Sequence, residues 1–446
     1  MEKMKNSGIE WIGEIPEGWE VSKLKYEVLE PLKYGASESG IEFDERLPRY
    51  IRITDIDSDG NLKEDGKLSL TEKQAKDYII NDNTILFARS GGTVGKTFFY
   101  HSNNKKAAFA GYLISAVPNP QKMYPNWLYL YTKSNAYWDW ANRVFTQATI
   151  QNIGADKYSE LYIPIPSIDI QKRIADFLDA KCGKIDGLKN DIQKQIETLE
   201  QYKKSVITEA VTGKLKFAGI NPNAKMKDSG IEWIGEIPEH WEIHPIYYYF
   251  EERKHKNSLC KEQNLLSLSY GNIIRKDINA LGGLLPESFN TYNIIEKDDI
   301  VIRPTDLQND KRSLRTGLCK EHGIITSAYI TLIPKKKVNS KYFHYLLHSY
   351  DIEKVFYNMG NGVRQGLNYS EFAKLLVISP TKDEQKDIVA YLDEKCSSID
   401  SIISTKKQQL EKLEEYKKSL IFEYVTGKKQ VFSGEFPSET SGKKEV

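Results

Sequence analysis

One stretch of the chain comes close to a loop that binds nucleotide phosphates. Residues 90–97 read SGGTVGKT, whereas a phosphate-binding loop requires the pattern G-x-x-x-x-G-K-[ST]. Gly91 lies one residue too close to Gly95, and Ser90 holds the position of the first required glycine. The stretch therefore predicts a strand–turn–strand with glycines at unusual φ angles, and it disfavours nucleotide binding.

Other patterns that could support catalysis are also incomplete. Residues 384–386 have the E-x-K form of a metal nuclease, but no Pro-Asp pair precedes them, and a helix cap is the favoured interpretation. The chain has no Pro-Pro pair, so the N/D-P-P-Y/F motif of amine methylation is missing. Its four cysteines lack C-x-x-C spacing, which disfavours a zinc site. We therefore expect a binding or assembly protein with no catalytic set, no metal and no cofactor of its own.

Composition limits the class of protein further. The 446 residues include 63 Lys and Arg against 62 Asp and Glu, so nucleic acid would have to bind local basic patches rather than a global positive field. A hydrophobic content of 40% excludes a wholly disordered chain. No apolar run approaches the roughly 18 residues that span a bilayer, and MEKMKNSGIEW lacks the apolar core of a signal peptide. These features predict a cytoplasmic protein.

The chain consists of two copies of one unit. Residues 7–19 and 229–241 match at twelve of thirteen positions, reading SGIEWIGEIPEGW and SGIEWIGEIPEHW. Residues 199–214, LEQYKKSVITEAVTGK, match residues 413–428, LEEYKKSLIFEYVTGK. The middles, 20–160 and 242–374, align only in places. Repeated ends around different middles indicate one scaffold that carries two specificities.

Each copy ends in a predicted long helix with an apolar heptad seam. Residues 171–212 contain no proline, and apolar residues recur in steps of seven, with others three residues further on. Thr381 and Glu384 predict a capping box at the second helix start, and Gly213 and Gly427 predict C-terminal stops. The predicted seam comprises Leu178, Ile185, Leu188, Ile192, Leu199, Tyr202, Val206, Leu392, Ile399, Ile402, Leu413, Tyr416 and Leu420. We favour an intramolecular pair of these helices; the alternative is that each packs on its own domain.

The two middles have the pattern of mixed α/β structure. Residues 88–100 and 110–118 in the first copy alternate like short strands with turns, as do 264–270, 299–304 and 327–334 in the second. Residues 127–144 and 342–358 carry aromatic side chains at helical spacing. We interpret these aromatics as core residues rather than as platforms on which bases stack.

The repeated ends resemble those of type I restriction–modification specificity subunits. The resemblance rests on the two SGIEWIGEIPE segments and on IPIPSIDIQKRIADFLDAKCGKID with its partner VISPTKDEQKDIVAYLDEKCSSID, each followed by a heptad helix ending in VTGK. It covers residues 7–428, and the chain departs from the seam pattern at Lys406, where the first copy has Ile192.

The resemblance implies an α+β architecture of two mixed α/β target recognition domains joined by two long helices in an antiparallel intramolecular coiled coil with a pseudo-two-fold internal repeat. The first domain would span 1–166, the first helix 167–213 and a linker 214–228. The second domain would span 229–380, the second helix 381–427 and a polar tail 428–446.

The resemblance also implies a function without catalysis. Each domain would read one half of a bipartite, asymmetric site on double-stranded DNA, and the helix pair would set the spacer between the halves. Two methyltransferase subunits would dock on the scaffold, and two restriction subunits that act as motor and nuclease could join. S-adenosylmethionine, ATP and Mg²⁺ would belong to those partners, with no cofactor bound by this chain.

Base reading requires Arg or Lys toward guanine and Asn or Gln toward adenine. We therefore select polar loop residues near glycines as candidates. For each of them, the alternative interpretation as an ordinary solvated loop residue has equal weight. Gln151 and Gln365 are repeat partners and could instead position phosphates. The candidates are Arg89, Ser90, Thr93, Lys96, Gln147, Thr149, Gln151 and Asn152 in the first domain, and Arg303, Thr305, Asp306, Arg312, Arg315, Arg364, Gln365 and Asn368 in the second.

Two other functional classes compete with DNA recognition. A coiled-coil adaptor would use the repeated ends, but one repeated partner would not require two different middles. A self-sufficient enzyme would require one of the motifs that the chain lacks. The divergence between 20–160 and 242–374 therefore favours the recognition scaffold.

Overall fold

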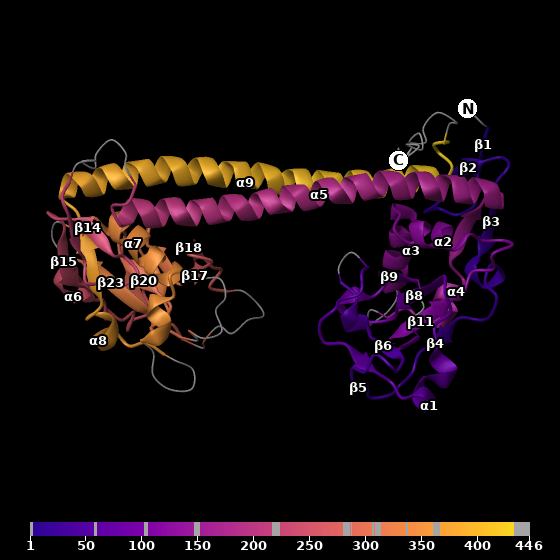
Figure 1. The fold of residues 1–446 in the computed structure, drawn as a ribbon, viewed down its shortest axis with the longest axis horizontal. Helices are drawn as coiled ribbons and strands as arrows, with labels where there is room; N and C mark the ends of the chain where they lie inside the picture. The colour runs from indigo at the N-terminus through magenta and orange to yellow at the C-terminus, as the bar shows by residue number, and fades with distance from the viewer. Residues whose placement is uncertain are drawn as a thin grey trace, which may run out of the picture. The chain divides into compact units, whose positions relative to one another are not determined.

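The computed structural model describes residues 3–57, 60–101, 106–146, 152–215, 224–279, 286, 288–305, 307, 314–335, 338–359 and 366–431. The chain divides into two compact units. Unit 1 comprises Met1–Ile192 and Gln408–Val446, and unit 2 comprises Gln193–Lys407. The division runs through both long helices, so each unit holds one mixed α/β domain and a segment of each helix (Figure 1).

In its described residues, unit 1 contains two four-stranded sheets. One sheet has the order β10-β6-β7-β5 (Ala107–Phe109, Arg49–Ile51, Leu68–Ser69, Ile41–Glu42), and the other has the order β4-β11-β8-β9 (Lys33–Tyr34, Leu113–Ala116, Thr84–Ala88, Thr97–Tyr100). Two-stranded pairs join β1 to β2 (Met4–Asn6, Glu14–Pro16) and β3 to β12 (Glu20–Lys23, Tyr162–Ile165). Every residue of β8 is buried, as expected of a strand covered on both faces.

Short helices connect and cover the strands of unit 1. They are η1 (Leu24–Tyr26), α1 (Glu72–Ala75), α2 (Pro125–Tyr131), α3 (Asn135–Thr146) and α4 (Ala155–Ser159), with further 3₁₀ turns η2 (Ile53–Asp55), η3 (Lys76–Tyr78) and η4 (Gly91–Thr93). The aromatic stretch that the spacing predicts as one helix is divided between α2 and α3. The break occurs where the hydroxyls of Thr132 and Ser134 donate to the carbonyls of Tyr129 and Tyr131.

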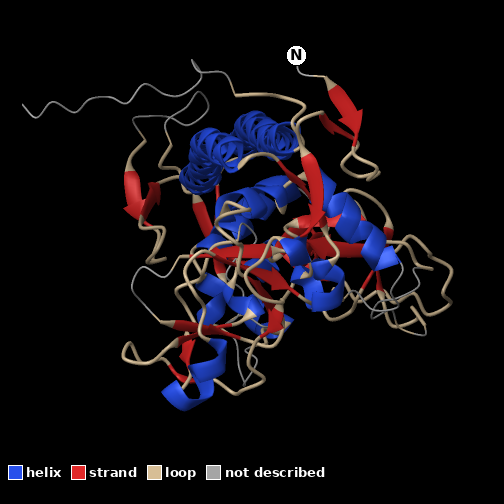
Figure 2. Cartoon of the chain, turned by 90° about the vertical axis from the view of Figure 1, so that its right-hand side faces the viewer, coloured by secondary structure: helices blue, strands red, loops and turns tan. Residues whose placement is uncertain are grey.

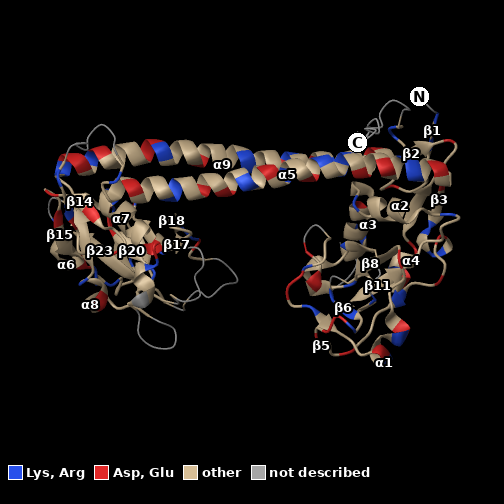
Figure 3. Cartoon of the chain, viewed as in Figure 1, with Lys and Arg blue, Asp and Glu red and all other residues tan. Residues whose placement is uncertain are grey.

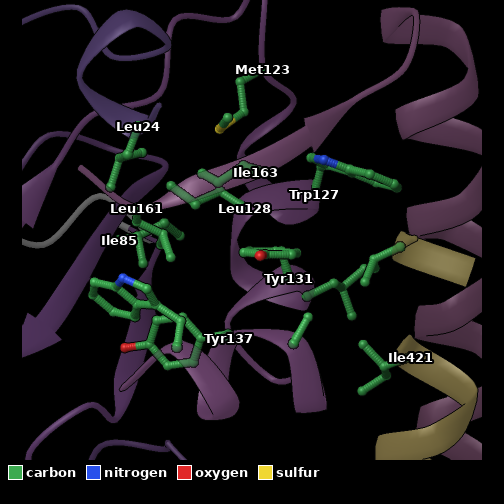
Figure 4. Close-up of a cluster of buried hydrophobic side chains, with 14 of the residues drawn as sticks. Leu24, Ile85, Met123, Trp127, Leu128, Tyr131, Tyr137, Leu161, Ile163 and Ile421 are labelled. Atoms are coloured by element: carbon green, nitrogen blue, oxygen red, sulfur yellow. The ribbon is translucent and has the colours of Figure 1, made fainter. Parts of the chain in front are cut away.

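The core of unit 1 joins the domain to the helices. Trp127, Tyr131 and Tyr137 are buried, and Trp127 Nε1 donates to the carbonyl of Pro164 at 2.9 Å. Ile421 of the second long helix belongs to the same cluster (Figure 4). The prediction that the aromatics of this stretch are core residues is confirmed for these three side chains.

Unit 2 has a different arrangement of strands in its described residues. Its largest sheet has the order β16-β23-β20-β21 (Phe250–Glu252, Ile330–Pro334, Ile300–Ile302, Thr316–Leu318). The two-stranded pairs are β13–β14 (Met226–Asp228, Glu236–Pro238), β15–β24 (Glu242–Pro245, Leu376–Ser379), β17–β18 (Leu266–Ser269, Asn272–Arg275) and β19–β22 (Asn293–Ile295, Gly323–Ile325). The helices are α6 (Ile246–Tyr249), α7 (Ser340–Ile352), the 3₁₀ turn η5 (Val355–Asn358) and α8 (Tyr369–Phe372). Figure 2 distinguishes the helices and strands of both units by colour.

The two long helices are α5 (Ile168–Val211) and α9 (Lys382–Val425), each of 44 residues. The predicted capping box is confirmed, because Glu384 N donates to Thr381 Oγ1 while the Glu384 carboxylate accepts from Thr381 N at 2.9 Å. Gly213 and Gly427 follow the helices with φ angles of +74° and +71°, as predicted for C-terminal stops.

Segments of α5 and α9 run antiparallel beside each other within each unit. In unit 1, Lys417 pairs with Asp186 at 2.7 Å and Lys189 pairs with Glu414 at 2.6 Å. In unit 2, Lys203 pairs with Asp400 at 2.7 Å, and Lys406 donates to Gln195 at 2.6 Å. Charged residues are accordingly spread along both helices (Figure 3).

The structure corrects the second line of the predicted seam. Residues of the seven-residue series are buried at Leu178, Ile185, Ile192, Val206, Leu392, Ile399 and Leu420, and half-buried at Leu199 and Leu413. The second apolar line lies four residues after the first, not three, at Cys182, Ile196, Cys396 and Ile403. The residues predicted three positions on are exposed, by 43–58% of their surface, at Leu188, Tyr202, Ile402 and Tyr416.

No helix in the described part of the chain is both long enough and apolar enough to cross a membrane. Among the same described residues, no group of three or more His, Cys, Asp and Glu side chains is arranged to hold a metal ion.

Candidate nucleic-acid interface

Two loops that are distant in the sequence meet at the end of β8 in unit 1. The carbonyl of Arg89 accepts a hydrogen bond from the Ile153 N–H at 2.9 Å, and Ser90 forms an isolated bridge with Asn152. Arg89 Nε donates to Asn152 Oδ1 at 3.3 Å. The structure thus brings together Arg89, Ser90 and Asn152, which the sequence selects separately.

Two exposed tyrosines border this contact. The Arg89 guanidinium lies 4.9 Å from the ring centroid of Tyr34, and the Arg89 N–H donates to the carbonyl of Tyr112 at 2.9 Å. Tyr34 is 42% exposed and Tyr112 is 62% exposed. We call Tyr34, Arg89, Tyr112 and Asn152 the Arg89 patch.

The backbone beneath the Arg89 patch is held closely. A β-carbon at Gly35, next to Tyr34, would lie 2.3 Å from the carbonyl oxygen of Phe109, so only glycine allows this approach. Tyr158 is buried and donates its hydroxyl to the carbonyl of Ala88 at 2.8 Å. Burial raises the pKa of this phenol well above its usual value, so it stays a neutral donor.

The chemistry of the Arg89 patch suits the edges of DNA bases. A guanidinium presents a planar fork of donors to guanine, an amide matches adenine, and phenol rings offer apolar contact. Arg89 contacts an amide and an aromatic ring, and one of its five N–H groups is used in the bond to Asn152.

The remaining predicted residues of the first domain are dispersed. Thr93 closes the 3₁₀ turn η4 between antiparallel strands β8 and β9, so the predicted strand–turn–strand is confirmed. Lys96 lines a groove of about 870 Å³ whose other wall comes from α5 and α9, including Asp179. Burial raises the pKa of Asp179. Gln147, Thr149 and Gln151 lie outside the described residues.

Unit 2 has the same junction at the end of β20. The carbonyl of Pro304 accepts a hydrogen bond from the Leu367 N–H at 2.9 Å, as Arg89 does from Ile153. Arg303 and Thr305, on either side of Pro304, are exposed. Asp306, Arg312, Arg364 and Gln365 lie outside the described residues.

Arg315 is not placed to contact DNA, which corrects its prediction as a base-reading residue. It is 1% exposed, and its Nη1 donates to the carbonyls of Thr305 at 2.6 Å and Arg303 at 3.3 Å. Its backbone N–H donates to Asp351 Oδ2 at 2.8 Å. Arg315 therefore holds the backbone that presents Arg303 and Thr305.

Asn368 has a structural role in this geometry. It is the N-cap of α8, and its Oδ1 accepts from the Glu371 N–H at 3.0 Å and from the Ser370 hydroxyl at 2.6 Å. An N-cap of this type stabilises a helix by roughly 1 kcal/mol. The capping bonds use the amide oxygen that base reading would need.

The repeated SGIEW segments pack on the ends of the long helices. In unit 1, a β-carbon at Gly427 would lie 2.4 Å from Pro16 Cδ and 3.1 Å from Trp19. In unit 2, a β-carbon at Gly213 would lie 2.9 Å from Pro238 Cδ. The segment of each copy therefore contacts the helix that belongs to the other copy.

Exposed tyrosines are not among the predicted site residues, since the only aromatic residues that the sequence singles out, in 127–144 and 342–358, are interpreted as core. Tyr34, Tyr112 and Tyr270 are each exposed and each adjoin a glycine, namely Gly35, Gly111 and Gly271. A tyrosine beside a glycine in a variable loop was the available signal.

Comparisons with known proteins place this geometry in a family. A family model described as the type I restriction modification DNA specificity domain matches residues 16–198 and 288–414. The chain is 27% identical over 442 residues to the protein named as the MjaX specificity subunit of a type I restriction enzyme in Methanocaldococcus jannaschii, covering 94% of this chain and 96% of that one. It is 24% identical over 439 residues to the MjaVIII specificity subunit of the same organism, covering 94% of each.

A solved structure described as the basis of complex assembly and conformational transition of the type I R-M system has a TM-score of 0.65 at 13% identity. The match covers 92% of this chain and 98% of that one, and at this identity it shows the fold alone. Because the family model matches well over half of the residues, in both copies of the repeat, the chain belongs to the type I restriction–modification DNA specificity family.

Proposed function

We propose that this chain is the DNA-reading scaffold of a type I restriction–modification complex. Each α/β domain reads one half of a bipartite, asymmetric site on double-stranded DNA. The observation that carries the proposal is the repeat itself: twelve of thirteen residues agree between 7–19 and 229–241, whereas the middles diverge. A protein that recognises two different half-sites with one repeated partner requires this combination.

The repeated strand-end junctions support the assignment of the reading surfaces. In each unit a strand ends at a loop that is bonded to the segment before a short helix, through Arg89 and Ile153 in one unit and Pro304 and Leu367 in the other. The scaffold of this junction is repeated, whereas the side chains it presents differ. This is the arrangement expected of two readers with separate specificities.

In this proposal α5 and α9 form one antiparallel intramolecular coiled coil. The ion pairs within each unit, Lys417 with Asp186 and Lys203 with Asp400, support it. A rod of 44 residues at about 1.5 Å per residue is roughly 66 Å long, enough to separate two major-groove segments one helical turn, about 34 Å, apart. The bases between the half-sites then become a spacer of fixed length.

Catalysis in this proposal resides in partners. Two methyltransferase subunits dock on the pseudo-two-fold scaffold, since two similar surfaces fit two copies of one partner. Two restriction subunits join to translocate and cleave DNA. S-adenosylmethionine, ATP and Mg²⁺ are bound by those subunits, and the complex works in the cytoplasm. Partner subunits would also supply phosphate contacts that a chain with a net charge of +1 lacks.

A methylome of a host that expresses this chain with its cognate methyltransferase tests the proposal. The expected result is a two-part motif with N6-methyladenine in both halves and a fixed spacer. A methyltransferase that co-purifies with the chain but leaves no bipartite mark would contradict it and favour the adaptor. Omitting the chain, with the methyltransferase alone, is the control.

A further inference from the structure

Unit 2 contains a two-stranded ribbon that is not hydrogen-bonded into the largest sheet. Strands β17 and β18 pair with the register Leu266↔Arg275, Ser267↔Ile274, Leu268↔Ile273 and Ser269↔Asn272. Leu266, Leu268 and Ile273 face the core cluster beneath. The opposite face therefore presents Ser267, Ser269, Asn272 and Ile274, of which Asn272 and Ile274 are exposed.

The ribbon is fixed beside the candidate interface of unit 2. A β-carbon at Gly317 in β21 would lie 2.6 Å from Leu268 Cδ1, so the ribbon packs directly on the strand backbone. At the ribbon's tip, a β-carbon at Gly271 would lie 3.7 Å from the carbonyl oxygen of Thr316. Thr316 of β21 is paired with Ile302, the residue before the exposed Arg303, and β18 contacts β21 (Figure 1).

The turn at the tip carries an unfavourable residue. Tyr270 and Gly271 both have positive φ, +47° and +78°, as a type I′ turn requires. Asn-Gly is the preferred pair in this turn, whereas a bulky aromatic residue in the left-handed region is strained. Tyr270 is nevertheless 65% exposed. The strain thus holds a large side chain in a position where it covers little of the core, which points to a function outside the fold.

The charge of the ribbon suits DNA. Residues 265–276 read LLSLSYGNIIRK and contain no acidic residue. Of the two basic residues at the base of the ribbon, Arg275 pairs with Glu321, whose carboxylate accepts from Arg275 Nε at 2.8 Å, and Lys276 is exposed. The major groove is about 12 Å wide and admits a two-stranded ribbon, and strands read bases there in several DNA-binding folds. Asn matches adenine, and an apolar ring contacts the methyl group of thymine.

We propose that the β17–β18 ribbon enters the major groove of the half-site read by unit 2, with Tyr270 and Asn272 at its tip as specificity-determining residues. The inference rests on the proposed function and extends it to an element that the base-reading candidates did not include. In this proposal the tip of the ribbon contacts base edges, and Arg303 lies in the same groove.

Three variants test it in the complex of the full chain with its methyltransferase. Tyr270→Asn creates the preferred turn pair, so it keeps the hairpin folded while removing the ring. Asn272→Ala removes the amide. Tyr247→Ala is the matched control, because Tyr247 on α6 is also exposed, by 53% of its surface against 65% for Tyr270. The measurements are the melting temperature and the methylation of a library randomised at each half-site.

The expected result is that Tyr270→Asn leaves the melting temperature unchanged or higher. Asn272→Ala should lower it slightly, because Asn272 Nδ2 donates to the carbonyl of Tyr270 at 3.3 Å within the turn. Both substitutions should raise the methylation of DNA sequences altered in one half-site at least 10-fold relative to the preferred site. The base preference at the other half-site should not change, and the Tyr247→Ala complex should keep the wild-type preference at both half-sites. An unchanged base preference with wild-type methylation would overturn the inference and leave the proposed function standing. A wild-type complex without a bipartite preference would overturn both.

Discussion

Lys417 Nζ lies 2.7 Å from both carboxylate oxygens of Asp186, and their repeat partners, Lys203 and Asp400, make the same contact in unit 2. Each pair joins a lysine of one copy to an aspartate of the other. The helices are antiparallel here, because the partner on α9 moves from residue 417 back to residue 400 as the contact on α5 moves from residue 186 forward to residue 203. The repeated lysine and aspartate positions therefore favour the antiparallel direction of the two helices.

The first prediction concerns the helix pairing. Lys417→Asp should destabilise the chain by about 0.5–1 kcal/mol, because it sets two carboxylates side by side on partly exposed helices. Adding Asp186→Lys should restore most of the loss by recreating the pair with reversed charges. Urea unfolding of the two single variants and the double variant measures this coupling. Additive losses would show that the two side chains do not interact.

The second prediction concerns the ends of the helices. Gly427→Ala should cost roughly 1–3 kcal/mol, since its φ is +71° and the added methyl group would meet Pro16. Gly183→Ala is the matched control in the interior of α5, where nothing lies within 4 Å, and it should stabilise by about 0.5–1 kcal/mol. Calorimetry of both variants tests the sign difference. Two stabilising substitutions would contradict the packing of Pro16 on the helix end.

Sequence periodicity predicts the long helices because their signals are local. The capping box at Thr381 and the glycine at 427 lie within one turn of the observed helix ends. The exposed face is harder to predict. An apolar residue that lies three positions after a seam residue fits a heptad pattern as well as one that lies four positions after it. Tyr202 and Tyr416 are apolar enough to fit the pattern, yet they are exposed because lysines at 203 and 417 occupy the inter-helix contact.

The candidate interface is only partly visible in the sequence. The types of Arg89 and Asn152 identify them, but their contact depends on a bridge between loops more than 60 residues apart. Arg315 shows the opposite case, because its type fits DNA reading while its burial makes it a backbone clamp. Residue type states what a side chain can do, and only the tertiary packing of the loops decides which partner it meets.

The third prediction concerns acid sensitivity of unit 2. Desolvation lowers the pKa of His344 to about 4 and that of His348 to about 3. Nearby lysines add to each shift, Lys320 at His344 and Lys203 at His348. A folded pKa below the unfolded value of about 6.5 favours the neutral ring in the folded state. Stability is therefore full above pH 6.5 and falls as the pH drops toward 4, by roughly 1–2 kcal/mol per histidine at pH 5.

The measurement is the melting temperature between pH 7.5 and pH 5, for wild type and for His344→Gln with His348→Gln. The double variant should flatten the acid limb. His322 has the opposite sign, since Glu296 and Glu262 raise its pKa, so its contribution is present below pH 6.5 and is lost at higher pH. A His322→Gln control removes this opposing contribution. If the melting temperature of the double variant falls with acid as steeply as that of the wild type, His344 and His348 are not the cause of the acid sensitivity.

The fourth prediction separates Arg315 from Arg303. Arg315→Ala should lower the stability of unit 2 by about 2–3 kcal/mol, because the carbonyls of Arg303 and Thr305 lose a buried charged donor. Arg303→Ala, at an exposed position, should leave unfolding nearly unchanged and alter DNA recognition. Paired urea titrations and binding assays distinguish the two. Equal stability of both variants would show that Arg315 does not clamp the loop.

The fifth prediction concerns the Arg89 patch. If Arg89 reads a base edge, Arg89→Ala should relax the preference at one position of the first half-site by about 10-fold or more and leave the second half-site intact. If it contacts only phosphate, the variant should weaken binding to all sequences alike and reduce the salt dependence. Arg143→Ala removes the same charge from an exposed position that pairs with Glu10, and it should change neither preference. Methylation of libraries randomised in each half-site at two salt concentrations separates these outcomes. A uniform loss would assign Arg89 to positioning, and the specificity of the first domain would then have to come from the exposed Tyr34 and Tyr112 beside it.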